Sequence, residues 1–209
     1  PLKTFQIVNT FRYETKQTRS FIRVREIHFF EAHTAHADEQ GATEQIAEDA
    51  QMVQRLLHDL CFPAIVSKRP VWDTFPGAWY STAVDAVMPN GRTLQVATYH
   101  HYRDQWARAF DLSYEDASGQ TRYCHQTTFG MSERLLGAVV GMHGDDNGLI
   151  IPPSIAPIQV VIMPVAAHTD SNVMPRVSQL AEHLSGSGIR VHLDSRDLRP
   201  GAKHYDWEI

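Results

Sequence analysis

Arginines at two distant places in the chain have the residue type and the setting that phosphate chemistry requires. Arg12 and Glu14 stand in the sequence FRYE, and Arg23 follows after a polar loop. Because a guanidinium carries a fixed charge and paired donors, arginines that converge from a strand, a loop and the next strand would form a cradle for phosphate oxygens. A surface strand with solvated charges is the alternative for this first segment.

The second place is Arg134, in the sequence GMSER, where an apolar helical pattern begins. A cation in the first turn of a helix is slightly disfavoured by the helix dipole. Arg134 is therefore expected to have a strong anionic partner. A bound anion would supply one, and a carboxylate of the protein itself is the alternative.

Alternation and helical spacing predict the elements that would position these arginines. Residues 21–30, FIRVREIHFF, alternate large apolar with charged side chains, which predicts a strand. Residues 38–60 have apolar side chains at steps of three and four, which predicts a helix with Thr43 as its cap. Residues 131–143 return to helical spacing and end near a glycine.

Turn residues predict antiparallel hairpins between these elements. The triplet at 89–91, Pro-Asn-Gly, is a tight turn before TLQVATYHH, and residues 118–119, Ser-Gly, join AFDLSYED to TRYCHQTTF. After a proline cluster, residues 158–164 and 189–193 are typical of strands and residues 173–184 of an amphipathic helix. This order implies a parallel pair with a right-handed crossover.

The change in pattern near Ala156 indicates two domains. Residues 1–156 are predicted to form an α+β domain, in which helices flank an antiparallel sheet. Residues 157–209 are predicted to form part of an α/β domain.

Composition limits the classes of protein and of partner. The net charge of −5 argues against a protein that coats nucleic acid, DNA included, so RNA contacts would need local basic patches. Prolines interrupt the apolar residues 149–167, so no membrane helix is expected there. Two cysteines, Cys61 and Cys124, suit a reducing cytosol. The start at Pro1 and the abrupt end at residues 207–209 indicate a fragment.

A metal site is a rival interpretation, because the chain has twelve histidines. The histidines closest together in the sequence are His28, His33, His36, His100 and His101. The spacing H-x4-H-x2-H of the first three fits no familiar zinc ligand frame. The sequence therefore predicts no metal held by protein side chains.

Taken together, these features resemble the class II aminoacyl-tRNA synthetases, with Arg12 and Glu14 in motif 2 and Arg134 in motif 3. Longer stretches, among them EAHTAHA, SKRPVWDTFPGAWY and HGDDNGLIIPPSIAPIQVV, resemble the archaeal and methanogen form of prolyl-tRNA synthetase over essentially all 209 residues. The resemblance implies a cytoplasmic enzyme that activates L-proline with ATP and Mg²⁺ and transfers the prolyl group to tRNA(Pro). It also implies a homodimer, whose motif 1 is missing here.

The resemblance assigns six residues to ATP: Arg12, Glu14, Arg23, Gln95, Thr98 and Arg134. Arg12 and Arg134 would be the catalytic cations, Arg12 at the α-phosphate and Arg134 at the γ-phosphate and against adenine. Glu14 would accept a hydrogen bond from the adenine amino group. Gln95 and Thr98 would meet the ribose and a metal-bound phosphate.

The resemblance assigns four residues to proline: Phe29 (or its neighbour Phe30), Glu31, His33 and His100. A compact apolar ring and a secondary ammonium require an aromatic wall and one carboxylate. In the second domain, which resembles the start of an anticodon-binding domain, Arg196, Arg199 and Lys203 would touch tRNA backbone phosphate. A solvated charged surface is the alternative for each of these three.

One segment departs from the family pattern. Where the family usually has GTxHHLGQNF, residues 97–106 are ATYHHYRDQW. Ala97, Tyr102 and Arg103 are expected beside the amino-acid pocket, where one methyl group changes discrimination by about 1–3 kcal/mol. The interpretations are a proline enzyme with a reshaped pocket or a paralogue that activates another amino or imino acid. A non-catalytic tRNA-binding or partner-binding relative would be expected to lose Arg12 or Arg134, and both are present.

Overall fold

The computed structural model describes residues 1–208 and contains two compact units, one ending at Met142 and the other beginning at His143. The domain boundary expected near residue 156 stays a prediction.

The first unit is built on a six-stranded sheet in the order β1-β2-β8-β5-β4-β3. The strands are β1 (Leu2–Phe11), β2 (Glu26–His36), β3 (Ala64–Lys68), β4 (Tyr80–Val87), β5 (Thr93–Arg103) and β8 (His125–Ser132). All neighbours pair antiparallel. The antiparallel sheet predicted for this part of the chain is confirmed, including the turn at Gly91, whose φ is +76°.

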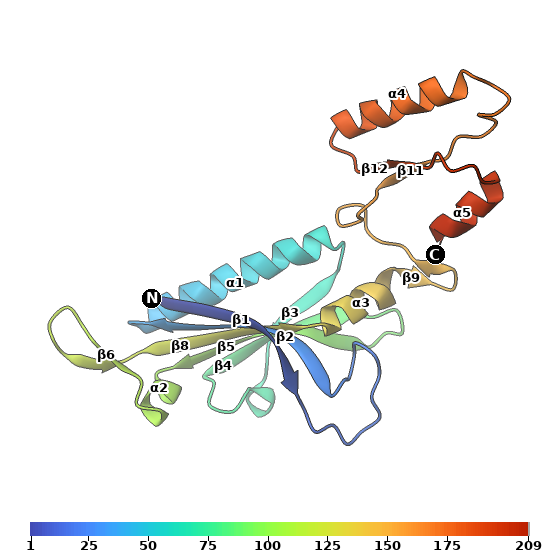
Figure 1. The fold of residues 1–209 in the computed structure, drawn as a ribbon. Coiled ribbons are helices and arrows are strands. Elements are labelled where there is room, and N and C mark those ends of the chain that lie inside the picture. Colours follow the sequence, from blue (N-terminus) through green and yellow to red (C-terminus); the bar gives the residue numbers. More distant parts are fainter. Residues whose placement is uncertain (209) are drawn as a thin grey trace. The chain divides into compact units, whose positions relative to one another are not determined.

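Helix α1 (Glu39–Asp59) runs along one face of this sheet (Figure 1). Its first turn is capped by Asp38, whose carboxylate accepts from the Gly41 N–H at 2.8 Å. The expected cap, Thr43, is wrong: it lies inside the helix and donates to the Glu39 carbonyl at 2.8 Å. Asp38 has the extended backbone that an N-cap residue needs, with φ −143° and ψ 171°.

The core lies between α1 and the sheet. Val53 and Leu57 of α1 belong to one buried cluster with Tyr99 of β5 and Phe129 of β8. Because side chains alternate along a strand, neighbours of these core residues point to the other face. The register places Glu31, Gly130 and Thr98 side by side on that face. The face opposite α1 therefore carries Glu31 and Thr98.

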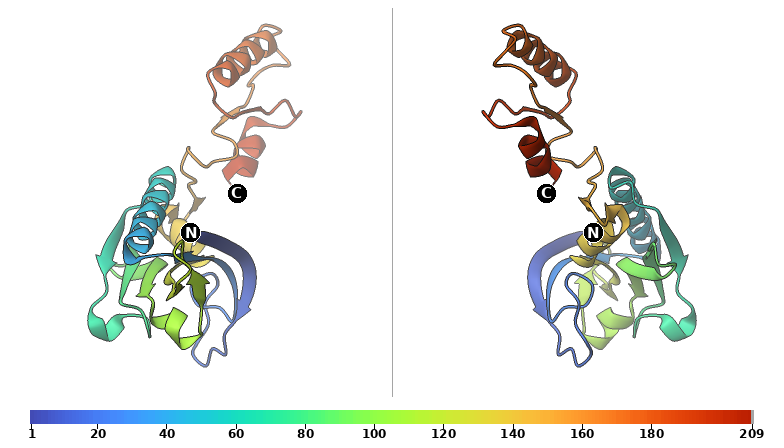
Figure 2. Two further views of the ribbon diagram at one scale, coloured as in Figure 1. Left: turned by 90° about the vertical axis from the view of Figure 1, so that its left-hand side faces the viewer. Right: turned by 90° about the vertical axis from the view of Figure 1, so that its right-hand side faces the viewer.

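Two predicted elements differ from the structure at their ends. The strand expected at 21–30 is β2, which runs from Glu26 to His36, because Arg19 and Arg23 form a local bridge that closes a turn in the loop after β1. Figure 2 shows this loop extending beyond the strands. The helix expected from residue 131 is α3 (Arg134–His143), since Met131 and Ser132 still pair within β8.

Smaller elements complete the first unit. They are the 3-10 helix η1 (Val71–Asp73), α2 (Gln105–Ala109), β6 (Ser113–Glu115) and β7 (Thr121–Tyr123). Strands β6 and β7 pair antiparallel across Gly119, whose φ is +79°. This confirms the hairpin predicted at Ser118-Gly119.

The second unit contains the predicted parallel pair. Strand β11 (Val160–Ile162) pairs parallel with β12 (Val191–Leu193), and α4 (Val173–Gly186) connects them. It also contains the short pair β9 (Gly144–Asp145) and β10 (Gly148–Leu149) and the helix α5 (Pro200–Glu208). Within residues 1–208, none of the helices has the length and apolar content needed to cross a bilayer.

Candidate functional site

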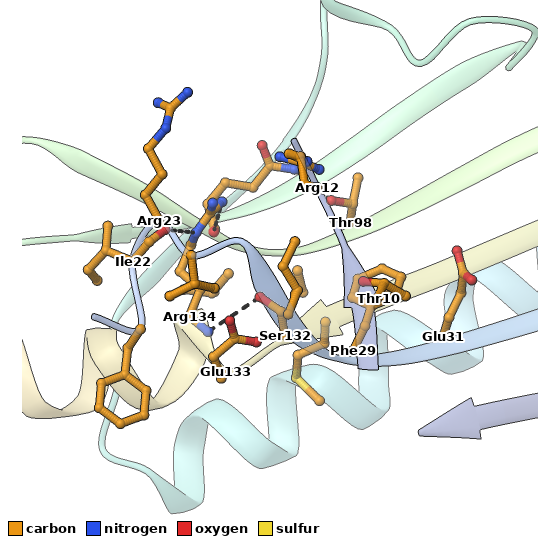
Figure 3. A pocket seen from close by; sticks show the side chains of 18 of the residues that line it. Thr10, Arg12, Ile22, Arg23, Phe29, Glu31, Thr98, Ser132, Glu133 and Arg134 are labelled. Carbon is orange, nitrogen blue, oxygen red and sulfur yellow. Dashed lines mark hydrogen bonds between the residues drawn. The ribbon is translucent and has the colours of Figure 1, made fainter. Parts of the chain in front are cut away.

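A cavity of about 540 Å³ is lined by β2, β5, β8, the start of α3 and the loop between β1 and β2. Its lining includes eight residues that the sequence assigns to substrates: Arg12, Glu14, Arg23, Phe29, Glu31, Gln95, Thr98 and Arg134. Arg12 and Arg23 line it from the two ends of the loop between β1 and β2, and Arg134 from the start of α3 (Figure 3). Residues far apart in the sequence thus meet around one hollow, and their roles stay predictions.

Arg134 is half-buried at the wall of this cavity. Its Nε donates to the Ile22 carbonyl at 3.0 Å and its Nη1 to the Gln95 carbonyl at 3.4 Å. Within the described residues it forms no ion pair, although Glu133 precedes it in the chain. Two neutral carbonyls orient a guanidinium but do not neutralise it, so its charge faces the cavity uncompensated.

The electrostatics of Arg134 agree with this picture. Burial lowers the pKa of Arg134, and the nearby positive charges of Arg12 and Arg23 lower it further, while Glu133 opposes them. The guanidinium stays protonated at any ordinary pH, so the lowered pKa reflects first the cost of burying its charge and second the like charges of Arg12 and Arg23. A cluster of this kind in a concave site favours an anionic ligand. The alternative of a protein carboxylate pairing with Arg134 is not seen in residues 1–208.

Glu14 and Arg23 are paired with each other. Arg23 Nε lies 2.9 Å from Glu14 Oε2 and its Nη2 donates to Oε1 at 3.0 Å. The Lys16 N–H also donates to this carboxylate, at 3.2 Å. The hydrogen bond from Arg23, followed by that from Lys16, lowers the pKa of Glu14. Glu14 is therefore ionised and acceptor-only, which the adenine role requires, while much of Arg23's capacity holds the loop.

Two polar side chains of β5 face the cavity from the neighbouring wall. The Gln95 amide nitrogen donates to the Thr98 hydroxyl at 2.6 Å. The Gln95 backbone carbonyl accepts from Arg134 at 3.4 Å, and both Gln95 and Thr98 line the same cavity as Arg12. These two residues therefore share the cavity with the arginines, as a nucleotide role would need.

Phe29 and Glu31 of β2 form the part of the cavity expected to take the amino acid. Gly130 of β8 lies against the Phe29 ring so closely that a Cβ there would come within 2.8 Å of the ring. The Glu31 carboxylate lies 3.0 Å from His33 Nε2 and accepts from the Gln6 amide at 3.3 Å. His33 does not line the cavity, but it contacts Glu31, which does.

His100 does not line the cavity, and its ring takes part in a hydrogen-bond chain with Ser81 and Phe75. The Phe75 N–H donates to the Ser81 hydroxyl oxygen at 3.0 Å, and that oxygen is 2.7 Å from His100 Nδ1. Ser81 is only 1% exposed, so its hydroxyl proton has His100 Nδ1 as its available acceptor. This assignment places the ring proton of His100 on Nε2. Burial lowers the pKa of His100 to about 4, with Glu31 opposing, so the ring is neutral near pH 7.

The residues that depart from the family pattern are accommodated in different ways. Arg103 adopts φ +51°, a backbone region that glycine occupies freely, and its side chain turns to Glu39 of α1 at 2.9 Å and stacks 3.5 Å above the Trp79 ring. Ala97 lies in the buried core and also borders the cavity. Tyr102 is buried. The added charge at residue 103 is thus neutralised by α1 rather than facing a substrate.

The residues assigned to tRNA lie at a second hollow of about 330 Å³, after the carboxyl ends of β11 and β12. Arg196 is already occupied: its Nη2 lies 2.7 Å from Asp194 Oδ2 and its Nη1 lies 2.8 Å from Asp206 Oδ2. Lys203 is 3% exposed and donates to the Asp194 carbonyl at 2.8 Å. Arg199 is exposed to solvent. Of the three, Arg199 has the cation best placed for an RNA phosphate.

Four of the five histidines that suggested a metal site contact other side chains of the protein. His33 contacts Glu31, His36 Nε2 lies 2.8 Å from the Thr34 hydroxyl, and His101 Nε2 lies 3.3 Å from that of Thr43. No group of three His, Cys, Asp or Glu side chains in residues 1–208 is arranged to hold an ion.

The chain matches known proteins along both units. Residues 1–143 match the family model described as tRNA synthetase class II core domain (G, H, P, S and T), and residues 159–209 match the one described as anticodon binding domain. The chain is 54% identical to the proline–tRNA ligase of Thermococcus kodakarensis and 51% identical to that of Methanosarcina mazei, covering 100% of this chain and 44% of each relative.

A solved structure is similar as well. The prolyl-tRNA synthetase of Giardia lamblia in complex with prolyl-adenylate superposes with a TM-score of 0.88 at 38% sequence identity, covering 99% of this chain and 44% of that one. The chain therefore spans less than half the length of the relatives it matches.

Proposed function

Because the chain belongs to the family of class II tRNA synthetase core domains, we propose that it activates L-proline with ATP to form prolyl-adenylate and passes the prolyl group to tRNA(Pro). The observation that carries this proposal is Arg134, a half-buried cation held by two carbonyl oxygens in a cavity that also contains Arg12. The names of the relatives support the choice of proline.

The first step is attack of a proline carboxylate oxygen on the α-phosphorus of ATP. The new P–O bond forms as the bond to the bridging oxygen of pyrophosphate breaks, and the leaving group carries the electron pair away. Charge grows on the phosphate oxygens, so fixed cations that face them lower the barrier. Arg12 acts at the α-phosphate, and Arg134 at the far end of the triphosphate, with Glu14 accepting from the adenine amino group.

Magnesium fits this proposal as a partner of the nucleotide. The described residues have no side-chain group arranged to hold an ion by itself, whereas a triphosphate supplies oxygen ligands that Mg²⁺ prefers. When bound, the ion would neutralise part of the charge on pyrophosphate. Gln95 and Thr98 are the neutral oxygen-bearing side chains on the adjacent wall.

Proline would be held by Phe29 and Glu31. The ring of Phe29 offers an apolar wall, and the Glu31 carboxylate offers an acceptor for the secondary ammonium. His33 fixes the carboxylate from behind at 3.0 Å. His100 of β5, neutral and with its proton on Nε2, would add a hydrogen-bond donor.

The second unit would bind the tRNA, with Arg199 contacting the backbone and Arg196 and Lys203 holding the loop that presents it. We place the boundary between the catalytic core and this domain after residue 156. A homodimer and a cytoplasmic location belong to the same proposal, and the unpaired Cys61 and Cys124 suit a reducing compartment.

The proposal is tested by ATP–pyrophosphate exchange with a panel of amino acids, using the full-length protein. Exchange is expected with proline and is expected to disappear in Arg12→Ala, while Arg92→Ala, at an exposed turn, serves as the matched control. Exchange with another amino or imino acid but not with proline would identify a paralogue. Binding of tRNA without exchange for any amino acid would identify a non-catalytic relative.

A further inference from the structure

Arg69 lies just behind the cavity without lining it. It follows β3, and its side chain is 23% exposed. Its Nη2 donates to Asp85 Oδ1 at 2.9 Å and to Gln95 Oε1 at 3.4 Å, and its Nε lies 3.5 Å from Asp73 Oδ2. One guanidinium therefore bridges a buried carboxylate of β4 and the amide of a residue that faces the cavity.

The register of the sheet brings these groups together. Asp85 of β4 lies directly opposite Gln95 of β5, next to a bulge that shifts the pairing after Val84. A bulge re-aims the side chains that follow it. Asp85, whose side chain is 10% exposed, thus anchors the cation that contacts Gln95.

The contact determines which end of the Gln95 amide faces Thr98. A guanidinium has donors and no acceptor, so it favours the amide oxygen on its own side. The amide nitrogen is then directed to Thr98 and donates to its hydroxyl oxygen at 2.6 Å. Because that oxygen already accepts a hydrogen bond, the Thr98 proton is available for an acceptor in the cavity.

The opposite orientation would have a different outcome. With the amide reversed, its nitrogen would face the donors of Arg69, and Thr98 would donate its proton to the amide oxygen. Thr98 would then present lone pairs to the cavity and repel an anionic oxygen. The direction of one amide decides whether this wall attracts or repels a phosphate.

We propose that Arg69 is a positioning residue that acts through Gln95 to keep the Thr98 hydroxyl a donor toward a phosphate oxygen of the bound nucleotide. This inference rests on the proposed function of the cavity. A lysine at residue 69 would still neutralise Asp85, but a single ammonium does not reproduce the fork that reaches both Asp85 and Gln95. Arg69→Lys therefore keeps the neutralisation of Asp85 but removes the contact that orients the Gln95 amide.

The test is proline-dependent ATP–pyrophosphate exchange by the full-length protein and by Arg69→Lys, with Arg92→Lys as the matched control. The hydrogen bond from the Thr98 hydroxyl to a charged phosphate oxygen is lost, so Arg69→Lys should lower kcat/KM for ATP by about tenfold or more. The KM for proline and the melting temperature should stay close to those of the wild type. Arg92→Lys should leave every value unchanged.

Gln95→Met provides a second variant that keeps the pair between Arg69 and Asp85. It should show a similar loss for ATP, and adding Arg69→Lys to it should lower the activity no further, because the intermediary is already gone. Wild-type activity in Arg69→Lys or in Gln95→Met, or losses that multiply in the double variant, would overturn the inference alone. Absence of exchange in the wild type would overturn the proposed function and the inference together.

Discussion

An arginine of the first unit is held by backbone carbonyls, whereas one of the second unit is held by carboxylates. Arg134 in the first unit contacts two backbone carbonyls, and burial lowers its pKa. Arg196 in the second unit is bound by two carboxylates, and the hydrogen bonds that it donates to Asp194 first and to Asp206 second raise its pKa. The sequence suggested a ligand contact for both. An arginine is therefore able to bind an anionic ligand when the fold orients its guanidinium without neutralising the charge.

The largest expected effect concerns Arg134. Arg134→Ala removes a fixed cation from the cavity, so kcat/KM for ATP in the exchange assay should fall by about 10²–10³-fold. Its melting temperature should change little, because only two carbonyl contacts are lost. A large loss of melting temperature with normal kinetics would place Arg134 with Arg196 as a structural arginine and break the comparison.

The reverse pattern is expected for Arg196. Arg196→Ala leaves the buried Asp194 carboxylate with Lys203 and the Trp207 indole, which donates at 2.9 Å. The melting transition of the second unit should fall by several degrees, while proline-dependent exchange stays near wild type. Calorimetry and exchange on the same preparation measure both, and an unchanged transition would show that this ion pair is dispensable.

Titration of His100 sharpens the contrast between buried and solvent-facing groups. An ordinary histidine has a pKa of about 6.5, whereas that of His100 is about 4 in the folded chain. Between these values the unfolded chain binds a proton that the folded chain does not, so folding stability should fall as the pH drops from about 6.5 to about 4.

His36 and His101 shift in the same direction, so the measurement needs a variant that isolates His100. His100→Asn should flatten part of this pH dependence, and nuclear magnetic resonance of the ring nitrogens should show the proton on Nε2 at pH 7. A titration near 6.5 would mean that the ring is open to solvent and that Ser81 does not fix its proton.

The smallest expected effect belongs to Arg199. Arg199→Glu should weaken tRNA binding several-fold, more at low salt than at high salt, because it changes one exposed contact to phosphate. Adenylate formation should be unaffected. Exposed Arg176 on α4 offers a matched charge reversal, and an equal loss in both variants would indicate a general charge effect rather than a specific contact.

Much of the fold could be predicted from local patterns. The spacing within residues 38–60 defined α1 nearly to its ends, and Gly91 and Gly119 marked hairpins because each adopts a positive φ. The strand ends near residue 21 could not be found in this way. A bridge between Arg19 and Arg23 closes a turn there. The side chains of residues 21–30 nevertheless alternate between apolar and charged, as they would in a strand.

The residues that line the cavity could be predicted better than the contacts between their side chains. Motif residues such as Arg12 and Arg134 meet at one cavity, and the family resemblance behind their assignment is confirmed at 54% identity. Pairing across loops and strands is set by register, so the contact of Glu14 with Arg23 and that of His100 with Ser81 had no signal in the sequence. Whether an arginine is neutralised depends on such contacts.

We propose that Arg12 and Arg134 bind one triphosphate between them. A crystal structure of the full-length protein with ATP, Mg²⁺ and proline tests this proposal most directly. The predicted result is a nucleotide in the 540 Å³ cavity with both guanidinium groups within hydrogen-bonding distance of its phosphates. A nucleotide bound elsewhere, or one whose phosphates contact only one of the two arginines, would contradict the claim.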